Sequence, residues 1–308
     1  MQTLKTIAIS VGDLNGVGFE ILLKGHETIL AVCRPLYCIS RAMAQQAAHL
    51  LERGLPDTFV CHEVAGEFTI RPGVVCPQSG RYSYDSFLCA IALATSGEAD
   101  AITTLPIHKE AWMMAGLPYV GHTDALRDLL HSDAIMMLGC EELYVALFTE
   151  HIPLREVPQH IQTDKLYDFL LRLNRTLQRS PVAVLGLNPH AGDNGVLGDE
   201  ERLIEEAIER ANSAIGKEVF QGPIVPDIAF TPRSRAYFKT VVAMYHDQGL
   251  APLKALYFDE GINVSLGLPL IRTSVDHGTA FDIAYQNKAL GLSYTNAIKA
   301  ALTFQVVE

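Results

Sequence analysis

The sequence predicts an α/β fold with a mainly parallel central sheet. Short, β-rich apolar segments alternate with longer segments of helical periodicity, which is the pattern of strand–helix–strand units. The 308 residues are 49% hydrophobic, which is enough for a large buried core, and the length indicates about two domains. The chain contains no internal repeat, low-complexity tract or obvious linker, so ordinary elements would join the two domains.

The individual elements follow from the spacing of apolar residues in each segment. Apolar, β-leaning runs predict strands at 6–11, 100–105, 142–149, 182–187, 227–230 and 240–245. Helical spacing predicts helices at 18–29, 83–99, 199–215 and 296–304. The helix at 199–215 is amphipathic, and the residues expected to share its apolar face are Leu203, Ile204, Ala207, Ile208 and Ala211.

Composition and charge argue against several classes of protein. The formal net charge is −11 and there is no run of Lys or Arg, which argues against a nucleic-acid partner. No stretch approaches the ~20 apolar residues of a membrane helix, and the N-terminus reads as a strand rather than a signal peptide. The six cysteines form no CxxC pair, so we expect reduced, mostly buried thiols in a cytoplasmic protein.

Three histidines lie just after predicted strands. His151 follows "YVALFTE", His190 follows "VAVLGL" within "NPHAGDNG", and His246 follows "VVAMY". Because ligands of open α/β sheets bind outside the carboxyl ends of strands, these positions are candidates for a site. A lone histidine is more often a hydrogen-bonded structural residue, but three at equivalent strand ends suit zinc, cobalt or a similar divalent ion. For "NPHAGDNG" the alternative is an ordinary tight turn before the next helix.

Basic and polar residues gather in comparable positions. His122 and Thr123 stand at a predicted helix start in "GHTDALRDLL", where a helix N-terminus would attract an anion. Thr123 could equally serve only as the N-cap. Lys254 and Arg272 follow apolar segments in glycine-rich or polar contexts, and Asn263 stands in "GINVSLGLP". These five side chains together would suit a phosphate group.

The glycine-rich segment "GDLNGVG" follows the first predicted strand. Its spacing is GxxxGxG rather than GxGxxG, and no acidic residue stands at a suitable distance to hold a ribose. The spacing alone therefore gives little support for a Rossmann dinucleotide loop, and the sequence does not identify residues that bind a cofactor.

Several of these segments belong to a longer pattern that resembles one known family, the 4-hydroxythreonine-4-phosphate dehydrogenases of pyridoxal phosphate biosynthesis. The matching segments run from near residue 10 to near residue 300: "TLPIHK", "GHTDAL", "NPHAGDNG", "GPIVPDIAF", "MYHDQGLAPLK" and "GINVSLGLPLIRTSVDHGTAFDIA". The resemblance implies the two-domain fold of the isopropylmalate and isocitrate dehydrogenases, with two α/β/α domains and the active site in the interdomain cleft. It implies a first domain of residues 1–125 plus about 270–308. The second domain, about 126–269, would carry most metal ligands and the dimer interface.

The resemblance also implies roles for individual residues. The positions that match metal ligands are His151, His190 and His246. The positions that match substrate-binding residues are His122, Thr123, Lys254, Asn263 and Arg272. Asp227 and Asp247 match acidic residues near the substrate. The general base stays open between Asp247 and a metal-bound hydroxide. The implied cofactors are NAD and a divalent metal, with zinc expected and magnesium or cobalt as alternatives, and the implied assembly is a homodimer with its active site at the interface.

Two departures from the family pattern bear on substrate detail. The first loop of the family often reads GDPAGIGPE, whereas residues 12–20 read GDLNGVGFE and lack both prolines, which changes the stiffness of the loop. Glu150 stands directly before His151, where threonine is common. Neither departure removes a predicted ligand.

The implied reaction is the NAD-dependent, metal-dependent oxidation of 4-phosphooxy-L-threonine to 2-amino-3-oxo-4-phosphooxybutanoate. That product would lose carbon dioxide to give 3-amino-2-oxopropyl phosphate. A metal on the C3 hydroxyl and the neighbouring amine would lower the pKa of the hydroxyl, and hydride would pass to the nicotinamide. Two alternatives stay open: a sister dehydrogenase for another phosphorylated four-carbon hydroxy acid such as threonate 4-phosphate, and a metal-dependent hydrolase with three histidine ligands.

Overall fold

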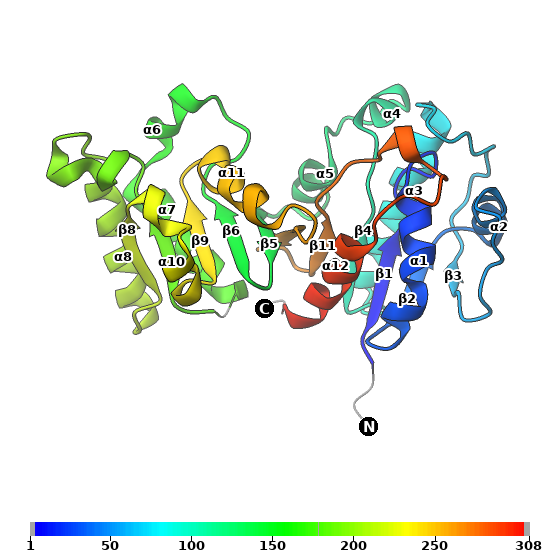
Figure 1. Ribbon diagram of the computed structural model, residues 1–308, viewed down its shortest axis with the longest axis horizontal. Helices are drawn as coiled ribbons and strands as arrows, with labels where there is room; N and C mark the ends of the chain where they lie inside the picture. Colours follow the sequence, from blue (N-terminus) through cyan, green and yellow to red (C-terminus); the bar gives the residue numbers. More distant parts are fainter. Residues whose placement is uncertain (1–3, 178, 305–308) are drawn as a thin grey trace.

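A computed structural model describes residues 4–177 and 179–304, and its centre is one continuous sheet of eleven strands (Figure 1). The strand order is β3-β2-β1-β4-β11-β10-β5-β6-β9-β7-β8. Most neighbouring strands pair in parallel, as the alternation of strands and helices predicted. The predicted α/β fold class is therefore confirmed.

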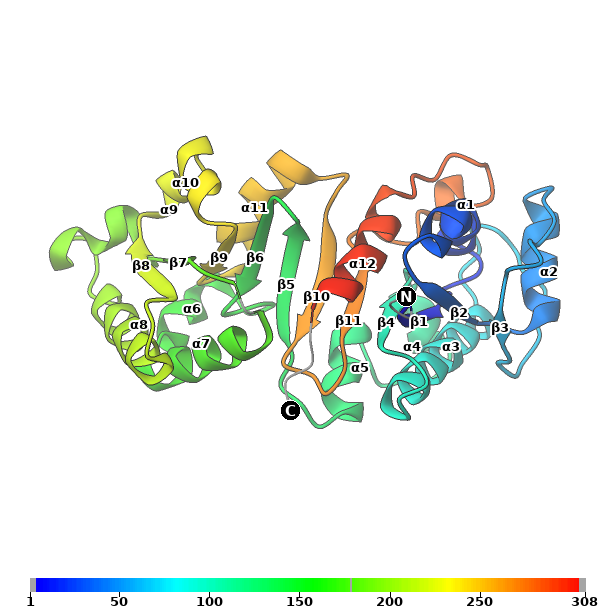
Figure 2. The ribbon, with the colours of Figure 1, turned by 90° about the horizontal axis from the view of Figure 1, so that it is seen from below.

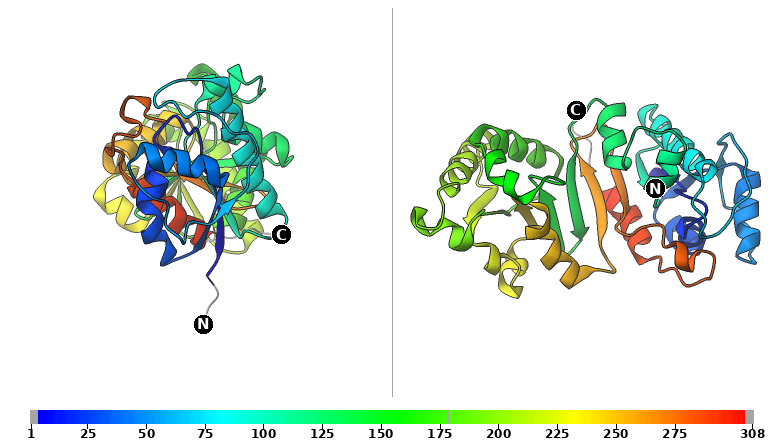
Figure 3. Two further views of the ribbon diagram at one scale, coloured as in Figure 1. Left: turned by 90° about the vertical axis from the view of Figure 1, so that its right-hand side faces the viewer. Right: turned by 90° about the horizontal axis from the view of Figure 1, so that it is seen from above.

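The sheet consists of two parallel blocks joined by an antiparallel centre. The first block contains β3 (Cys61–His62), β2 (Arg34–Cys38), β1 (Thr6–Ser10), β4 (Ala101–Thr104) and β11 (Arg272–Val275). The second block contains β6 (Leu143–Leu147), β9 (Thr240–Ala243), β7 (Val182–Leu185) and β8 (Phe220–Ile224). Between them β10 (Ile262–Leu266) and β5 (Ile135–Cys140) pair antiparallel with their neighbours and lie side by side in Figure 3. These reversals make the two blocks run in opposite directions.

Helices cover both faces of each block (Figure 2). On the first block, α1 (Gly18–Leu30) and α12 (Leu292–Thr303) lie on one face, and α3 (Pro77–Thr95), α4 (Lys109–Met114) and α5 (His122–Leu129) lie on the other. On the second block, α9 (Pro226–Ala229), α10 (Pro232–Tyr237) and α11 (His246–Tyr257) lie opposite α6 (Val157–His160), α7 (Thr163–Leu177) and α8 (Glu201–Ile215). The remaining helical segments are α2 (Arg41–Leu50), η1 (Leu154–Glu156), η2 (Pro189–Gly195) and η3 (Phe281–Ile283).

Most predicted elements are confirmed, with three corrections. The segment 227–230 is helical in α9, because Pro226 occupies the first turn, where its missing N–H costs nothing. The strand predicted at 240–245 ends at Ala243, so His246 opens helix α11. Leu203 is 38% exposed, while the other residues predicted on its face of α8 are buried.

The first loop, which lacks the two prolines of the family pattern, is held by hydrogen bonds and close packing. The buried Asn15 side chain donates to the carbonyl of Val74 at 2.6 Å and accepts from the N–H of Arg71 at 2.8 Å. The N–H of Val17 donates to Thr279 O at 2.9 Å, and a Cβ on Gly16 would lie 2.7 Å from that same oxygen. Glycine is therefore required where this loop packs against the segment after β11.

The two-domain division of the chain stays a prediction, because the sheet itself continues from one block to the other. The outermost parts of the proposed first domain, residues 1–3 and 305–308, lie outside the described residues. In the part of the chain that the structure describes, no helix is long and apolar enough to cross a membrane.

Candidate active site

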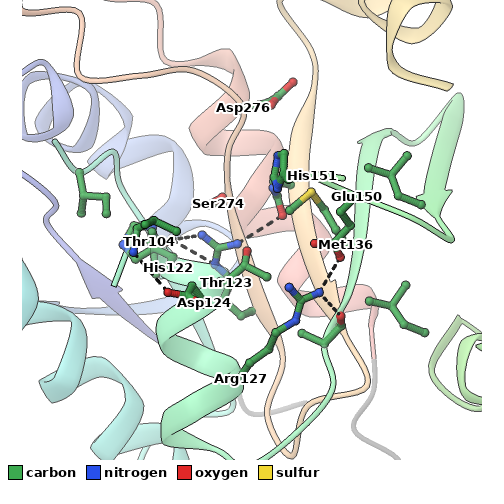
Figure 4. Close-up of a pocket in the computed structure, with 18 of the residues that line it drawn as sticks. Thr104, His122, Thr123, Asp124, Arg127, Met136, Glu150, His151, Ser274 and Asp276 are labelled. Carbon is green, nitrogen blue, oxygen red and sulfur yellow. Dashed lines mark hydrogen bonds and ion pairs between the residues drawn. The ribbon is translucent and has the colours of Figure 1, made fainter. Parts of the chain in front are cut away.

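A cleft of about 1120 Å³ lies between the two blocks. Its walls are the end of β4, helix α5, the start of β5, the loop after β6 and the segment after β11 (Figure 4). Of the predicted substrate and metal residues, the cleft is lined by His122, Thr123, His151, Asn263 and Arg272.

Arg272 is a buried cation at the base of this cleft. The residue is 3% exposed, and its Nε and Nη2 donate to the hydroxyl of Thr104 at 3.2 and 2.8 Å. Its Nη1 donates to Asn263 Oδ1 at 3.3 Å and to Ser265 Oγ at 3.2 Å. Burial lowers the pKa of the guanidinium to about 9, and the described residues provide it with no carboxylate. A buried charge that is hydrogen-bonded but not neutralised favours an anionic group beside it.

Arg272 and Asn263 do not follow strands, as the sequence suggested, but lie within them. Asn263 belongs to β10 and Arg272 opens β11, and the two strands form an antiparallel pair. Their side chains meet because this pairing places them close together.

Helix α5 presents its N-terminus beside Arg272. Gly121 is its N-cap and provides no side-chain hydrogen bond, so Thr123 lies in the first turn rather than at the cap. The Nε2 atom of His122 is buried and has no hydrogen-bond partner among the described residues, while its ring packs edge-on against Phe87 and Trp112. Burial, and to a smaller extent the charge of Arg272, lowers the pKa of His122 well below its usual 6.5. The neutral imidazole of His122 and the uncapped start of α5 therefore line the same cleft as the Arg272 guanidinium.

The lowered pKa of His122 leads to a pH-dependent effect on stability. The unfolded chain takes up this proton near pH 6.5, whereas the folded chain resists it, so stability is lost as the pH falls below about 6.5. We expect the melting temperature of the wild type to fall by about 2–4 °C more than that of His122→Gln between pH 7.5 and 5.5. Differential scanning calorimetry of both proteins would measure this, and parallel pH profiles would contradict it.

Lys254 on α11 does not line the cleft itself, but it contacts a residue that does. Its Nζ is 3.2 Å from Oδ2 of Asp276, which lines the cleft from the segment after β11. The lysine is thus held at the edge of the cleft by an ion pair that an incoming anion would compete with.

His151 and His246 come together, with ring centroids 5.4 Å apart. Nδ1 of His246 hydrogen-bonds to Oδ1 of Asp247 at 2.7 Å, which leaves Nε2 free. The hydroxyl of Thr149 donates to Met244 O at 2.6 Å and so ties the two histidine segments to each other. A carboxylate behind a histidine whose other nitrogen is free is a common arrangement at metal sites.

His190 does not join this pair. It is exposed in η2, where the backbone at 190–194 is left-handed at every residue, and the loop is anchored through Asn188 to Glu200 and Glu201. No group of three or more His, Cys, Asp or Glu side chains within the described chain could hold a metal ion. Asp227 is exposed on α9 and does not line the cleft, and the side chain of Asp247 is 84% exposed.

Two charged residues of the cleft, Arg127 and Asp276, are not predicted from the sequence. Arg127 on α5 pairs with Glu150, and Asp276 pairs with Lys254. Arg127 lies one helical turn after Thr123, and that spacing was the available signal. The sequence alone does not predict that Arg127 pairs with Glu150.

Comparison with known proteins identifies the family. The family described as Pyridoxal phosphate biosynthetic protein PdxA matches residues 31–301. A relative from Sulfurimonas denitrificans, named 4-hydroxythreonine-4-phosphate dehydrogenase, is 62% identical over 296 residues, which covers 96% of each chain.

The chain belongs to the PdxA family. As a PdxA protein it is an oxidoreductase of pyridoxine biosynthesis. The crystal structure of 4-hydroxythreonine-4-phosphate dehydrogenase from Klebsiella pneumoniae is similar with a TM-score of 0.83 and 36% identity, covering 97% of this chain and 98% of that one. A beta-decarboxylating dehydrogenase from Thermococcus kodakarensis shares the fold alone, with a TM-score of 0.50 and 13% identity over 97% of this chain and 82% of that one. The resemblance seen in the sequence is confirmed.

Proposed function

We propose that this PdxA protein oxidises 4-phosphooxy-L-threonine with NAD, in a metal-dependent reaction, to 2-amino-3-oxo-4-phosphooxybutanoate, which loses carbon dioxide to give 3-amino-2-oxopropyl phosphate. The observation that supports this substrate class is the buried guanidinium of Arg272. It has no carboxylate partner among the described residues and lies next to the uncapped start of α5. Such a site favours a phosphate ester over a neutral substrate. A cytoplasmic location is part of the proposal, because all six cysteines are free thiols.

Different residues of the cleft and its edge would bind different parts of the substrate. Arg272, His122 and the N–H groups at the start of α5 would bind the phosphate, and Asn263 keeps the guanidinium oriented. Lys254 would exchange its ion pair with Asp276 for the phosphate. Asp247 orients His246 through Nδ1 and is one candidate to accept the proton of the C3 hydroxyl. NAD would accept the hydride. No residues are assigned to NAD binding.

The two adjacent imidazoles fit a divalent metal, with zinc the first choice and magnesium or cobalt as alternatives. When bound, the metal would lower the pKa of the substrate hydroxyl. A single chain supplies two of the three predicted ligands, so we propose that His190 reaches the site of a second subunit in a homodimer. Large apolar side chains near both loops are exposed and support a covered surface there: Leu154, Val196 and Leu197.

The test is NADH formation with each candidate phosphate. The proposed function requires the highest kcat/KM with 4-phosphooxy-L-threonine. A higher value with threonate 4-phosphate would favour the sister dehydrogenase. Release of inorganic phosphate without NADH would favour the hydrolase.

Loss of the phosphate contacts should weaken substrate binding selectively. We expect Arg272→Lys and Lys254→Ala each to raise the KM for the phosphorylated substrate about 10- to 100-fold, since each loses a charge-assisted contact of ~1.5–3 kcal/mol. The Kd for NAD should change less than about threefold. An unchanged substrate KM in both variants would refute the phosphate assignment.

A further inference from the structure

An ion pair that the proposed mechanism does not use crosses the cleft between α5 and the loop after β6. Nη2 of Arg127 lies 2.6 Å from Oε1 of Glu150 and donates to Ala134 O at 2.9 Å. The Glu150 side chain is 13% exposed and that of Arg127 is 37% exposed, so the contact is partly shielded from water. Figure 4 shows the pair spanning the two walls.

Each partner is adjacent to a different part of the proposed site. Arg127 lies one helical turn after Thr123, on the helix that presents the phosphate-binding start. Glu150 directly precedes His151. The contact therefore joins the helix that would bind the phosphate to the loop that carries His151.

Hydrogen bonds also hold the histidine loop on the side that faces β9. The N–H of Phe148 donates to Ala243 O at 2.9 Å, and Thr149 bonds to Met244 O through both its N–H and its hydroxyl. These bonds tie the loop to β9 and the His246 segment. Among the hydrogen bonds and ion pairs of residues 4–177 and 179–304, the Arg127–Glu150 pair is the one that joins the loop to α5.

We propose that Arg127 and Glu150 form a positioning pair that sets His151 relative to the phosphate-binding start of α5. The functional part of this inference rests on the proposed dehydrogenase function. It also gives a structural role to Glu150, which departs from the threonine common in the family. Because each charge neutralises the other in a partly shielded cleft, removing one partner should be more harmful than removing both.

The test is a double-mutant cycle of Arg127→Met, Glu150→Thr and the double variant, all assayed at a temperature where each is folded. We expect each single variant to lose about tenfold or more in kcat/KM and the double variant to recover to within about threefold of the wild type. Arg127→Lys, which keeps the charge, should lose less than Arg127→Met. Strictly additive losses, or single variants with unchanged kcat/KM, would overturn the proposal.

Hydrogen–deuterium exchange provides a readout that needs neither substrate nor metal. In each single variant, exchange should rise in both 121–131 and 148–153, because the contact that joins them is broken. The matched control is Arg210→Met, which breaks a 2.8 Å arginine–carboxylate pair to Asp164 between α7 and α8, outside the cleft. It should leave both segments unchanged.

The two readouts separate the possible failures. A wild type that forms no NADH would refute the proposed function, while the exchange data would still decide whether the pair holds the two segments. Unchanged exchange in both segments of both single variants, or an equal rise in the control, would refute the pair itself.

Discussion

His246→Ala is expected to lose at least about 1000-fold in turnover and most of its bound metal, because one of three proposed ligands is gone. His151→Ala should behave in the same way, since the two rings are neighbours in one chain. Asp247→Asn should be milder, at about 10- to 100-fold, because Asp247 acts only through Nδ1 of His246. Metal content by mass spectrometry and NADH formation would be measured together on each variant.

The control for this series is His49→Ala, which removes an exposed histidine of α2 far from the cleft lining. It should keep wild-type metal content and turnover. A His246→Ala protein with full metal and full activity would remove this residue from the proposed site. A His246→Ala protein with wild-type metal content but no turnover would instead indicate that His246 binds the substrate or transfers a proton.

Part of this site could be predicted from the sequence because it depends on local pattern. His151, His190 and His246 follow β6, β7 and β9, which are neighbours in one parallel block, so the strand-end rule selected three positions at one edge. The rule does not say whether a side chain turns toward its neighbours. The left-handed backbone at 190–194 leaves His190 exposed, and no spacing in "NPHAGDNG" indicates that conformation.

The rest of the site depends on long-range pairing, which a single sequence does not contain. Arg272 is held by Thr104 from a strand 168 residues earlier in the chain, and Asn263 reaches it only because β10 and β11 are antiparallel. Both strands are short and carry polar residues, so their periodicity is weak. The helix α9 was missed for a related reason: "DIAF" is too short for its apolar pattern to distinguish a strand from one helical turn.

Mixed dimers should test the proposal that His190 crosses the interface of a homodimer. His151 and His246 are adjacent within one chain, whereas His190 is exposed and separate, so a shared site would combine the first two with His190 of the other subunit. A dimer of one His190→Ala chain and one His246→Ala chain then has one intact site and one site with both defects. Random mixing of equal amounts makes about half of the dimers mixed, and each mixed dimer has one intact site of two. The mixture should therefore show about a quarter of the wild-type activity.

The matched control combines His151→Ala with His246→Ala. Because these two residues belong to the same side of a shared site, every site of a mixed dimer would lack one ligand, and activity should stay absent. The two mixtures therefore differ only in whether the second defect lies on the opposite side of the site. Native mass spectrometry would verify that mixed dimers have formed. If verified mixed dimers of His190→Ala and His246→Ala stay inactive, His190 does not complete the partner's site, and the shared metal centre is excluded.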